Sequence, residues 1–213
     1  MRVKTEARRQ AILATAADVF QEVGFDAASM AEIAVRTGGS KATLYNYFSS
    51  KEELFVEVML SSAQKQGRDM FFAALQRSGD LQAILQNLGQ SFLKIIMAPE
   101  IVAMRRIVIS QSGRSDLGRL FYERGPKSAW AQVTDLLQSA IDNRVLRPAD
   151  ARIMTMHLKS LYEAEVVELQ LLGVISKVTR KEIERIVAAA VEVFMRAYGA
   201  SPAGNAEKKN ARS

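Results

Sequence analysis

The stretch of residues 29–54 limits the possible folds of this chain more than any other, because helix starts and a glycine turn follow one another closely within it. It reads SMAEIAVRTGGSKATLYNYFSSKEEL. Ser29 and Glu32 have the spacing of a capping box, in which each side chain accepts a hydrogen bond from the other residue's backbone N–H. Thr37-Gly38-Gly39 must end this first helix, because adjacent glycines favour a turn and oppose a helix.

A second short helix is predicted directly after the glycine turn. Ser40 can cap it, and it covers residues 41–48. Leu44 and Phe48 lie four residues apart on one face and can pack inward. Two helices joined by a short glycine-containing turn are typical of the helix-turn-helix motif, whose second helix enters the major groove of DNA. A further capping box, Ser50 with Glu53, predicts a third helix from residue 51.

The outward face of the second helix suits contact with DNA, because no carboxylate occurs between Lys41 and Ser50. Lys41 can reach a phosphate or a guanine edge, and small side chains let the helix approach the groove closely. Phenol hydroxyls and an amine suit phosphate oxygens, whereas Asn46 can bind either adenine or phosphate. The predicted DNA-contact residues are Ser29, Lys41, Ala42, Thr43, Tyr45, Asn46, Tyr47 and Lys51. The alternative is a small helical turn in an all-α protein, with Tyr45 and Tyr47 as amphipathic packing residues.

The same residues resemble a known family. Residues 20–25 (FQEVGF), then residues 29–54, and above all the block SKATLYNYFSSKEEL at residues 40–54, are similar to the DNA-binding domain of TetR-type transcriptional repressors. One departure is Ala28, where the family often has a threonine beside the capping residue, and the resemblance then implies one phosphate contact fewer. The resemblance also implies that the basic residues Arg2, Lys4, Arg8 and Arg9 lie near the DNA backbone; a solvated basic arm is the alternative.

Composition narrows the function classes. The formal net charge is +6 and the pI about 9.6, which favours a polyanionic partner. Cysteine is absent, which excludes disulfides, thiolate metal sites and a cysteine nucleophile. The charged N-terminus lacks the apolar core of a signal peptide, and the apolar run at residues 92–97 is too short to cross a bilayer. We therefore expect a soluble, cytoplasmic protein without a cofactor or a metal ion.

The remainder of the chain predicts helices and no strands, and hence an all-α fold. We expect a helix-turn-helix DNA-binding domain at residues 1–50, a larger helical ligand-binding and dimerisation domain at 51–199, and a disordered tail at 200–213. The first helix should start after Thr5 and end near Val23, and Gly24 follows at the position where a left-handed helical cap is least costly. The later predicted helices cover residues 51–77, 81–97, 100–110, 116–122, 129–142, 151–172 and 180–198.

The middle of the chain carries a second, weaker resemblance. Arg105-Arg106 and the run FYERGP at residues 121–126 resemble the AefR-like type of TetR C-terminal domain. This resemblance implies a small-molecule pocket among the middle helices, and methionine adapts to irregular ligands. The alternative is plain hydrophobic core. The candidate lining residues are Phe92, Met97, Met104, Phe121, Trp130, Met154, His157 and Tyr162.

The last two predicted helices are apolar over more than one face, so they must be buried in the monomer or against a partner. In TetR-type proteins the last two helices of each subunit form a four-helix dimer interface, and the resemblance implies the same here. The candidate interface residues are Leu161, Val167, Ile183, Ile186, Val187, Ala190 and Phe194. A dimer would present two recognition helices to an inverted-repeat operator, and a ligand would act by favouring a conformer that no longer fits the DNA.

Two rival functions have less support. An all-α enzyme could use His157 with Glu163, Glu165 and Glu168, but a lone histidine without a second base or a metal shell is poor catalytic equipment. An architectural DNA-binding protein without a ligand is the other rival. The sequence therefore predicts a ligand-responsive DNA-binding transcriptional regulator, most simply a repressor, and not an enzyme.

Overall fold

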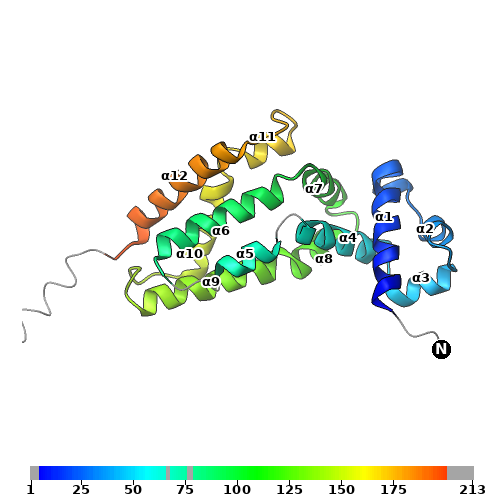
Figure 1. The fold of residues 1–213 in the computed structure, drawn as a ribbon, viewed down its shortest axis with the longest axis horizontal. Coiled ribbons are helices and arrows are strands. Elements are labelled where there is room, and N and C mark those ends of the chain that lie inside the picture. The colour runs from blue at the N-terminus through cyan, green and yellow to red at the C-terminus, as the bar shows by residue number, and fades with distance from the viewer. Residues whose placement is uncertain (1–4, 66–67, 76–78, 201–213) are drawn as a thin grey trace, which may run out of the picture. The chain divides into compact units, whose positions relative to one another are not determined.

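The computed structural model describes residues 5–65, 68–75 and 79–200, and these residues form twelve helices (Figure 1). The predicted all-α class is confirmed: within the described ranges there is no strand, only two isolated β-bridges. None of the described helices combines the length and the apolar character that a membrane span requires. The helices are α1 Glu6–Ala27, α2 Met30–Arg36, α3 Lys41–Tyr47, α4 Lys51–Lys65, α5 Arg68–Leu75, α6 Leu81–Ile96, α7 Pro99–Gln111, α8 Leu117–Arg124, α9 Pro126–Asp142, α10 Ala151–Glu163, α11 Val167–Leu171 and α12 Arg180–Tyr198.

Side-chain caps fix where these helices begin. Ser29 and Ser40 accept hydrogen bonds from the backbone N–H groups of Glu32 and Thr43, each at 3.1 Å. Thr179 and Glu182 form a complete capping box at the start of α12. These predicted starts are therefore confirmed, because a cap satisfies backbone donors that have no partner in the first turn.

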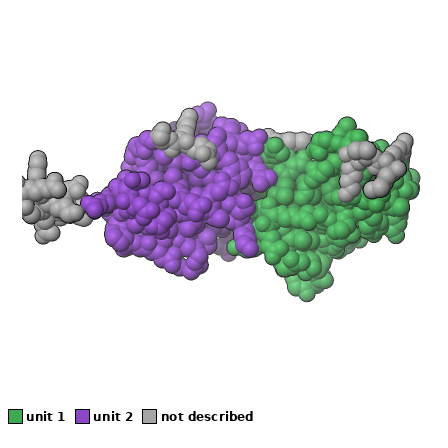
Figure 2. All heavy atoms as spheres, turned by 90° about the horizontal axis from the view of Figure 1, so that it is seen from below, with its two compact units in different colours: residues 1–66, 99–126 green, residues 67–98, 127–213 purple. Residues whose placement is uncertain are grey.

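The chain forms two compact units, coloured separately in Figure 2. Unit 1 consists of residues 1–66 and 99–126, and unit 2 consists of residues 67–98 and 127–213. The predicted domain boundary at residue 50 lies inside unit 1, because α4 packs on α1 while α7 and α8 pack on α4. A separate DNA-binding domain of residues 1–50 stays a prediction.

Aromatic packing fixes α4 on α1 in the core of unit 1. The Phe55 ring meets the Phe20 and Phe25 rings edge-on, with centroid distances of 4.9 and 5.2 Å. Leu44 and Phe48 of the α3 segment are buried in the same core, as predicted. The short helices α2 and α3, too short to be stable alone, are thereby held on α1 and α4.

The core of unit 2 is built around α6, which packs along α5, α10 and α12. Gly89 allows this close approach: a Cβ atom there would lie 2.6 Å from Cε1 of Tyr162 and 2.8 Å from Cγ1 of Val187. The Tyr162 hydroxyl donates to the carbonyl oxygen of Leu85 at 2.7 Å, and its burial raises the pKa of Tyr162 well above the ordinary value. This polar group is thus satisfied inside an apolar core.

Several sequence predictions need correction. The predicted helix 151–172 is interrupted at residues 164–166, and this break brings Val166 and Val167 into the core of unit 2. Helical spacing puts Val23 on the apolar stripe of α1 and Ile109 on that of α7, which predicts burial, but the two side chains are 42% and 57% exposed. Helical periodicity identifies an apolar stripe, but only the packed structure shows which of its edges is covered.

Two further predictions concern helix ends. Gly24 interrupts α1 with φ 78° and ψ 171°, an extended conformation open to glycine rather than the left-handed helical cap that was expected. The single helix predicted at residues 51–77 corresponds to α4 and α5, and residues 66–67 and 76–77 between and after them lie outside the described residues. The predicted disordered tail likewise lies outside them, except for its first residue.

Candidate nucleic-acid interface

The turn between α2 and α3 is closed by its two glycines, as the sequence predicted. Gly38 has φ 70°, a conformation that favours glycine. The N–H groups of Gly38 and Gly39 donate to the carbonyl oxygens of Val35 and Ala34, each at 2.9 Å. Arg8 of α1 lies against this turn, since a Cβ atom at residue 39 would be 2.8 Å from its guanidinium. The turn therefore sets the angle between α2 and α3 and is supported by α1.

The outward face of α3 carries most of the predicted DNA-contact residues. Lys41, Ala42, Tyr45 and Asn46 are exposed, whereas Leu44 on the opposite face is buried. The Lys41 ammonium lies 5.8 Å from the centre of the Tyr45 ring, which is within cation–π range. A cation and a phenol are thus presented together on one helical face.

The other predicted contact residues on this side are partly engaged within the unit. The Thr43 and Ser40 hydroxyls lie 2.9 Å apart, and Thr43 is half-buried. The Tyr47 hydroxyl accepts a hydrogen bond from the backbone N–H of Thr5 at 3.1 Å, so it fixes the start of α1. Ser29 is exposed and caps α2. Arg2 and Lys4, the other basic residues predicted near the DNA backbone, lie outside the described residues.

Lys51 is held by the protein itself. Its ammonium donates to the carbonyl oxygens of Phe25, Asp26 and Ala28, at 2.7, 3.3 and 3.0 Å. It also lies 4.4 Å from the centre of the Phe25 ring. An ammonium has only three protons to donate, so the geometry gives Lys51 a role in joining α4 to the end of α1. Its predicted contact with a DNA phosphate stays a prediction.

Acidic groups near α2 are neutralised within unit 1. Arg36 forms ion pairs with Glu22 at 2.6 Å and Glu32 at 2.8 Å. The hydrogen bond to Glu22 raises the pKa of Arg36 above its ordinary value, against a smaller opposing effect of burial. Because the Glu32 side chain pairs with Arg36, only the serine half of the predicted capping box with Ser29 is confirmed.

The candidate ligand-pocket residues lie in both units. Met104 and Phe121 pack against the core of unit 1. In unit 2, Phe92 and Trp130 meet edge-on with ring centroids 4.9 Å apart, and Phe92 lies 6.3 Å from Tyr162. Met97 and Met154 are buried in the same core, whereas His157 is exposed.

Most candidate dimer-interface residues face the interior of their own subunit. Val187 and Phe194 are fully buried in unit 2, and Ile186, Ala190 and Val167 are buried beside them. Leu161 and Ile183 are half-buried. Buried side chains leave no surface for a second subunit in this conformation. The large apolar side chains that α10 and α12 expose are Ile153, Met156 and Val193.

The residues of the rival enzyme hypothesis do not form a catalytic cluster. His157 Nδ1 lies 2.5 Å from the Tyr198 hydroxyl. Glu163 pairs with Lys159, and Glu165 pairs with Arg185 at 2.6 Å. Among the described residues, no group of three histidine or acidic side chains is placed to bind a metal ion.

Sequence reasoning missed Arg124, which forms ion pairs with Glu53 and Glu57 of α4. Of the predicted capping box, Ser50 accepts from the Glu53 backbone N–H at 3.0 Å as expected, but the Glu53 side chain accepts from Ser49 and Arg124 instead. The four-residue spacing of the two glutamates was a visible signal. Nothing in the sequence could connect Glu53 and Glu57 with an arginine 71 and 67 residues further along the chain.

Family models match both parts of the chain. Residues 12–58 match the model described as bacterial regulatory proteins of the tetR family. Residues 83–200 match the model described as the C-terminal domain of AefR-like transcriptional repressors. Both descriptions are of transcriptional regulators rather than enzymes.

Curated relatives match over about a quarter of the chain. The chain is 47% identical over 58 residues to the HTH-type transcriptional activator FasR of Mycolicibacterium smegmatis, which is 27% of this chain and 26% of that protein. It is 42% identical over 53 residues to the HTH-type transcriptional regulator RutR of Escherichia coli K12, a quarter (25%) of each chain. The chain therefore matches about a quarter of the length of these relatives.

Solved structures match over nearly the whole chain. A TetR-family regulator from Mesorhizobium loti is 27% identical, with a TM-score of 0.78 over 93% of this chain and 100% of that one. The flavonoid-responsive regulator FrrA is 32% identical, with a TM-score of 0.74 over 92% of this chain and 98% of that one. Sequence, fold and relatives agree, and the chain belongs to the TetR family of DNA-binding transcriptional regulators, with a C-terminal part of the AefR-like type.

Proposed function

We propose that this protein is a ligand-responsive transcriptional repressor of the cytoplasm, which binds an inverted-repeat operator as a homodimer and is released by a small molecule. The observation that carries this proposal is the outward face of α3. Lys41, Tyr45 and Asn46 are exposed on it, and the helix is anchored from behind by buried Leu44. No carboxylate lies on α3 to repel phosphate.

The homodimer is supported by the exposed apolar side chains of α10 and α12. Val193 is 51% exposed, and Ile153 and Met156 are also exposed. Burying such side chains against a second copy would stabilise a dimer, at about 25 cal/mol per Å² of apolar surface. Two recognition helices related by a twofold axis would read half-sites about 34–36 Å apart, or a multiple of that spacing.

The ligand is proposed to bind in unit 2, at the aromatic side chains of α6, α9 and α10. Phe92 packs against both Trp130 and Tyr162 there, so an entering molecule would have to separate these rings and would favour a different helix packing. Such a ligand shifts the population toward that conformer only if it binds that conformer more tightly. Because FrrA is named as flavonoid-responsive, flavonoids are the first compounds to test.

Repression rather than activation is proposed because the C-terminal part matches the model described as AefR-like repressors. FasR is named as an activator, but it matches only 27% of this chain, whereas the repressor model matches residues 83–200.

The test begins with selection of duplexes from a random library by the purified full-length protein. We expect an inverted repeat to be enriched, and we expect at least one flavonoid or hydrophobic compound to release the protein from that duplex in an equilibrium titration. A protein that enriches no sequence would overturn the proposal. Specific binding that no compound in the panel weakens would favour an architectural DNA-binding protein.

A further inference from the structure

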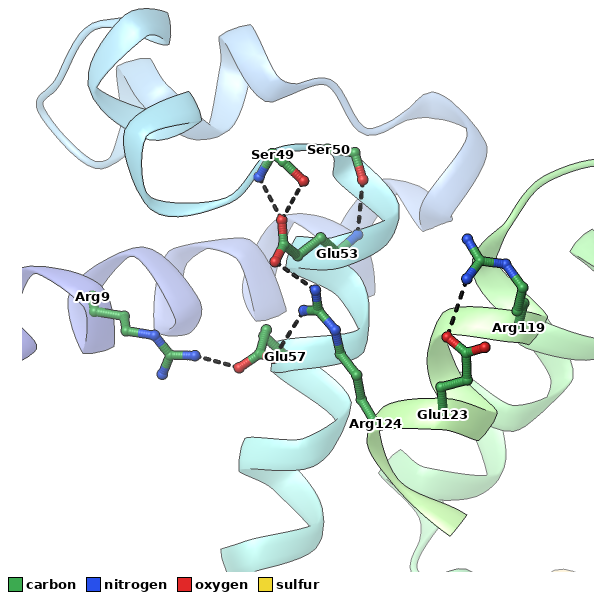
Figure 3. A network of polar contacts seen from close by, with 8 residues as sticks. All are labelled: Arg9, Ser49, Ser50, Glu53, Glu57, Arg119, Glu123 and Arg124. Atoms are coloured by element: carbon green, nitrogen blue, oxygen red, sulfur yellow. Dashed lines mark hydrogen bonds and ion pairs between the residues drawn. The ribbon is translucent and has the colours of Figure 1, made fainter. Parts of the chain in front are cut away.

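Two glutamates of α4, Glu53 and Glu57, lie one helical turn apart (Figure 3). Each of them binds a residue that lies next to α3 or packs on its end. Glu53 Oε2 accepts hydrogen bonds from the backbone N–H of Ser49 at 2.6 Å and from the Ser49 hydroxyl at 2.5 Å. Glu57 pairs with Arg9 in the first turns of α1. The two carboxylates therefore connect α4 to the residue after α3 and to the start of α1.

Both of these contacts reach the C-terminal end of α3, the proposed recognition helix. The Arg9 guanidinium, while paired with Glu57, also lies 5.5 Å from the centre of the Phe48 ring. Phe48 is the C-terminal cap of α3, and Ser49 follows it directly. The angle between α3 and α4 is thus restrained in two ways. Glu53 acts through Ser49, and Glu57 acts through Arg9 and Phe48.

One residue of α8 joins the two carboxylates. Arg124 Nη2 lies 2.7 Å from Glu53 Oε1, and its Nη1 lies 3.2 Å from Glu57 Oε1. The glutamate side chains are only about one-fifth exposed (19% and 20%), so water screens their interaction less than at an open surface. Two like charges four residues apart on a helix repel each other, and the forked guanidinium offsets that repulsion while fixing both side chains.

The protonation states agree with this arrangement. The hydrogen bond to Glu53 raises the pKa of Arg124 above its ordinary value, and burial opposes this less strongly. At Glu53 burial favours the neutral acid, but the hydrogen bonds from Ser49 and Arg124 together outweigh it and lower the pKa of Glu53. Both groups are therefore charged at neutral pH.

We infer that Arg124 is a positioning residue for DNA recognition: by holding Glu53 and Glu57 together it sets the orientation of α3, although it does not itself lie on the DNA-facing surface of α3. This inference rests on the proposed function, that α3 reads DNA. Arg124 lies two residues before Pro126, where the chain leaves unit 1 and α9 begins. Arg124 is therefore the contact between α8 and the two α4 carboxylates that hold the α3 segment.

The same helix supplies a matched control. Arg119 pairs with Asp116, the N-cap of α8, at 3.0 Å and with Glu123, in the last turn of α8, at 3.1 Å. Figure 3 shows the pair with Glu123. Removing either arginine removes one positive charge and two ion pairs from α8. Only the loss of Arg124 changes a contact with α4.

The first measurement uses full-length wild type, Arg124→Ala, Arg124→Lys and Arg119→Ala with the duplex that the wild type enriches and with a random duplex. Titrations are done far below the melting temperature, which is recorded for each variant. We expect Arg124→Ala to bind the enriched duplex roughly 3- to 20-fold more weakly, and random DNA almost as well as wild type. Arg124→Lys, which keeps the charge but lacks the planar fork that meets both carboxylates, should be intermediate, and Arg119→Ala should stay within about twofold of wild type.

The second measurement is amide hydrogen exchange without DNA, in which the backbone N–H of Ser49 reports on its bond to Glu53. We expect faster exchange at Ser49 and in α3 for Arg124→Ala, and unchanged exchange for Arg119→Ala and throughout α6. Equal behaviour of the two alanine variants in either measurement would overturn the inference. Because hydrogen exchange is measured without DNA, it tests whether Arg124 positions α3 even if the wild type enriches no duplex and the proposed function fails.

Discussion

Gly89 of α6 lies against the ring of Tyr162, so closely that a single added methyl group would come within 2.6 Å of ring atom Cε1. Gly89→Ala should therefore destabilise the protein although alanine is the better helix former. We expect a loss of about 1–3 kcal/mol in the free energy of unfolding, the range for overpacked cores, measured by urea unfolding. Gly118→Ala in α8 is the control, because its new methyl group would meet only the Ser112 hydroxyl at 3.4 Å. Equal stability of both variants would show that α6 can move away at little cost.

Lys41 and Lys51, which the sequence assigned to the same surface, should respond differently to substitution. Lys51→Met leaves the carbonyl oxygens of Phe25 and Ala28 without their donor, and we expect unfolding to become easier by about 1–3 kcal/mol. Lys41→Met, on an exposed position, should leave the melting temperature unchanged and weaken DNA binding. If Lys51→Met instead keeps wild-type stability and loses DNA affinity, the ammonium contacts phosphate as the sequence suggested.

The hydrogen bonds to Glu53 make part of the stability depend on pH. Since its pKa is lower in the folded protein than in the unfolded chain, its contribution is fully present above the ordinary glutamate pKa of about 4.3 and is lost as the pH falls through the lower folded value. Melting temperatures of wild type and Glu53→Gln should differ most at neutral pH and converge in acid. Ser49→Ala, which removes one donor, should reproduce part of this change. If the melting temperatures of wild type and Glu53→Gln differ by the same amount at every pH down to strong acid, the lowered pKa of Glu53 is contradicted.

Association of two subunits should depend on the exposed apolar side chains of α10 and α12. Val193→Arg places a charge where we propose that a second copy packs, and an unpaired charge in such an interface is costly. Sedimentation equilibrium should therefore show a dimer for wild type and a shift toward monomer for the variant. Met70→Arg, at an exposed position of α5, should remain dimeric. A dimer that tolerates Val193→Arg would place the interface elsewhere.

Local signals in the sequence predicted much of unit 1. The caps Ser29 and Ser40, the turn at Gly38 and the inward packing of Leu44 each depend on residues within a few positions of one another, and each was found as expected. The family was predicted from the same short block, and the match of residues 12–58 confirms it.

What could not be predicted depends on contacts between distant residues. The carbonyl oxygens that hold Lys51 lie about 25 positions earlier in the chain, and a lysine beside a recognition helix looks the same in sequence whether it binds phosphate or backbone. The faces of α12 posed the same difficulty. Val193 widens the apolar stripe that contains Phe194, but Phe194 packs into its own subunit and Val193 stays exposed.

The central claim is that the outward face of α3 reads DNA. The most direct measurement is an equilibrium titration of the enriched duplex with wild type and with the double variant Lys41→Ala, Tyr45→Ala. We expect the double variant to keep the wild-type melting temperature and to bind the duplex at least about tenfold more weakly, a loss of roughly 1.4 kcal/mol or more. Unchanged affinity in a correctly folded double variant would contradict the claim.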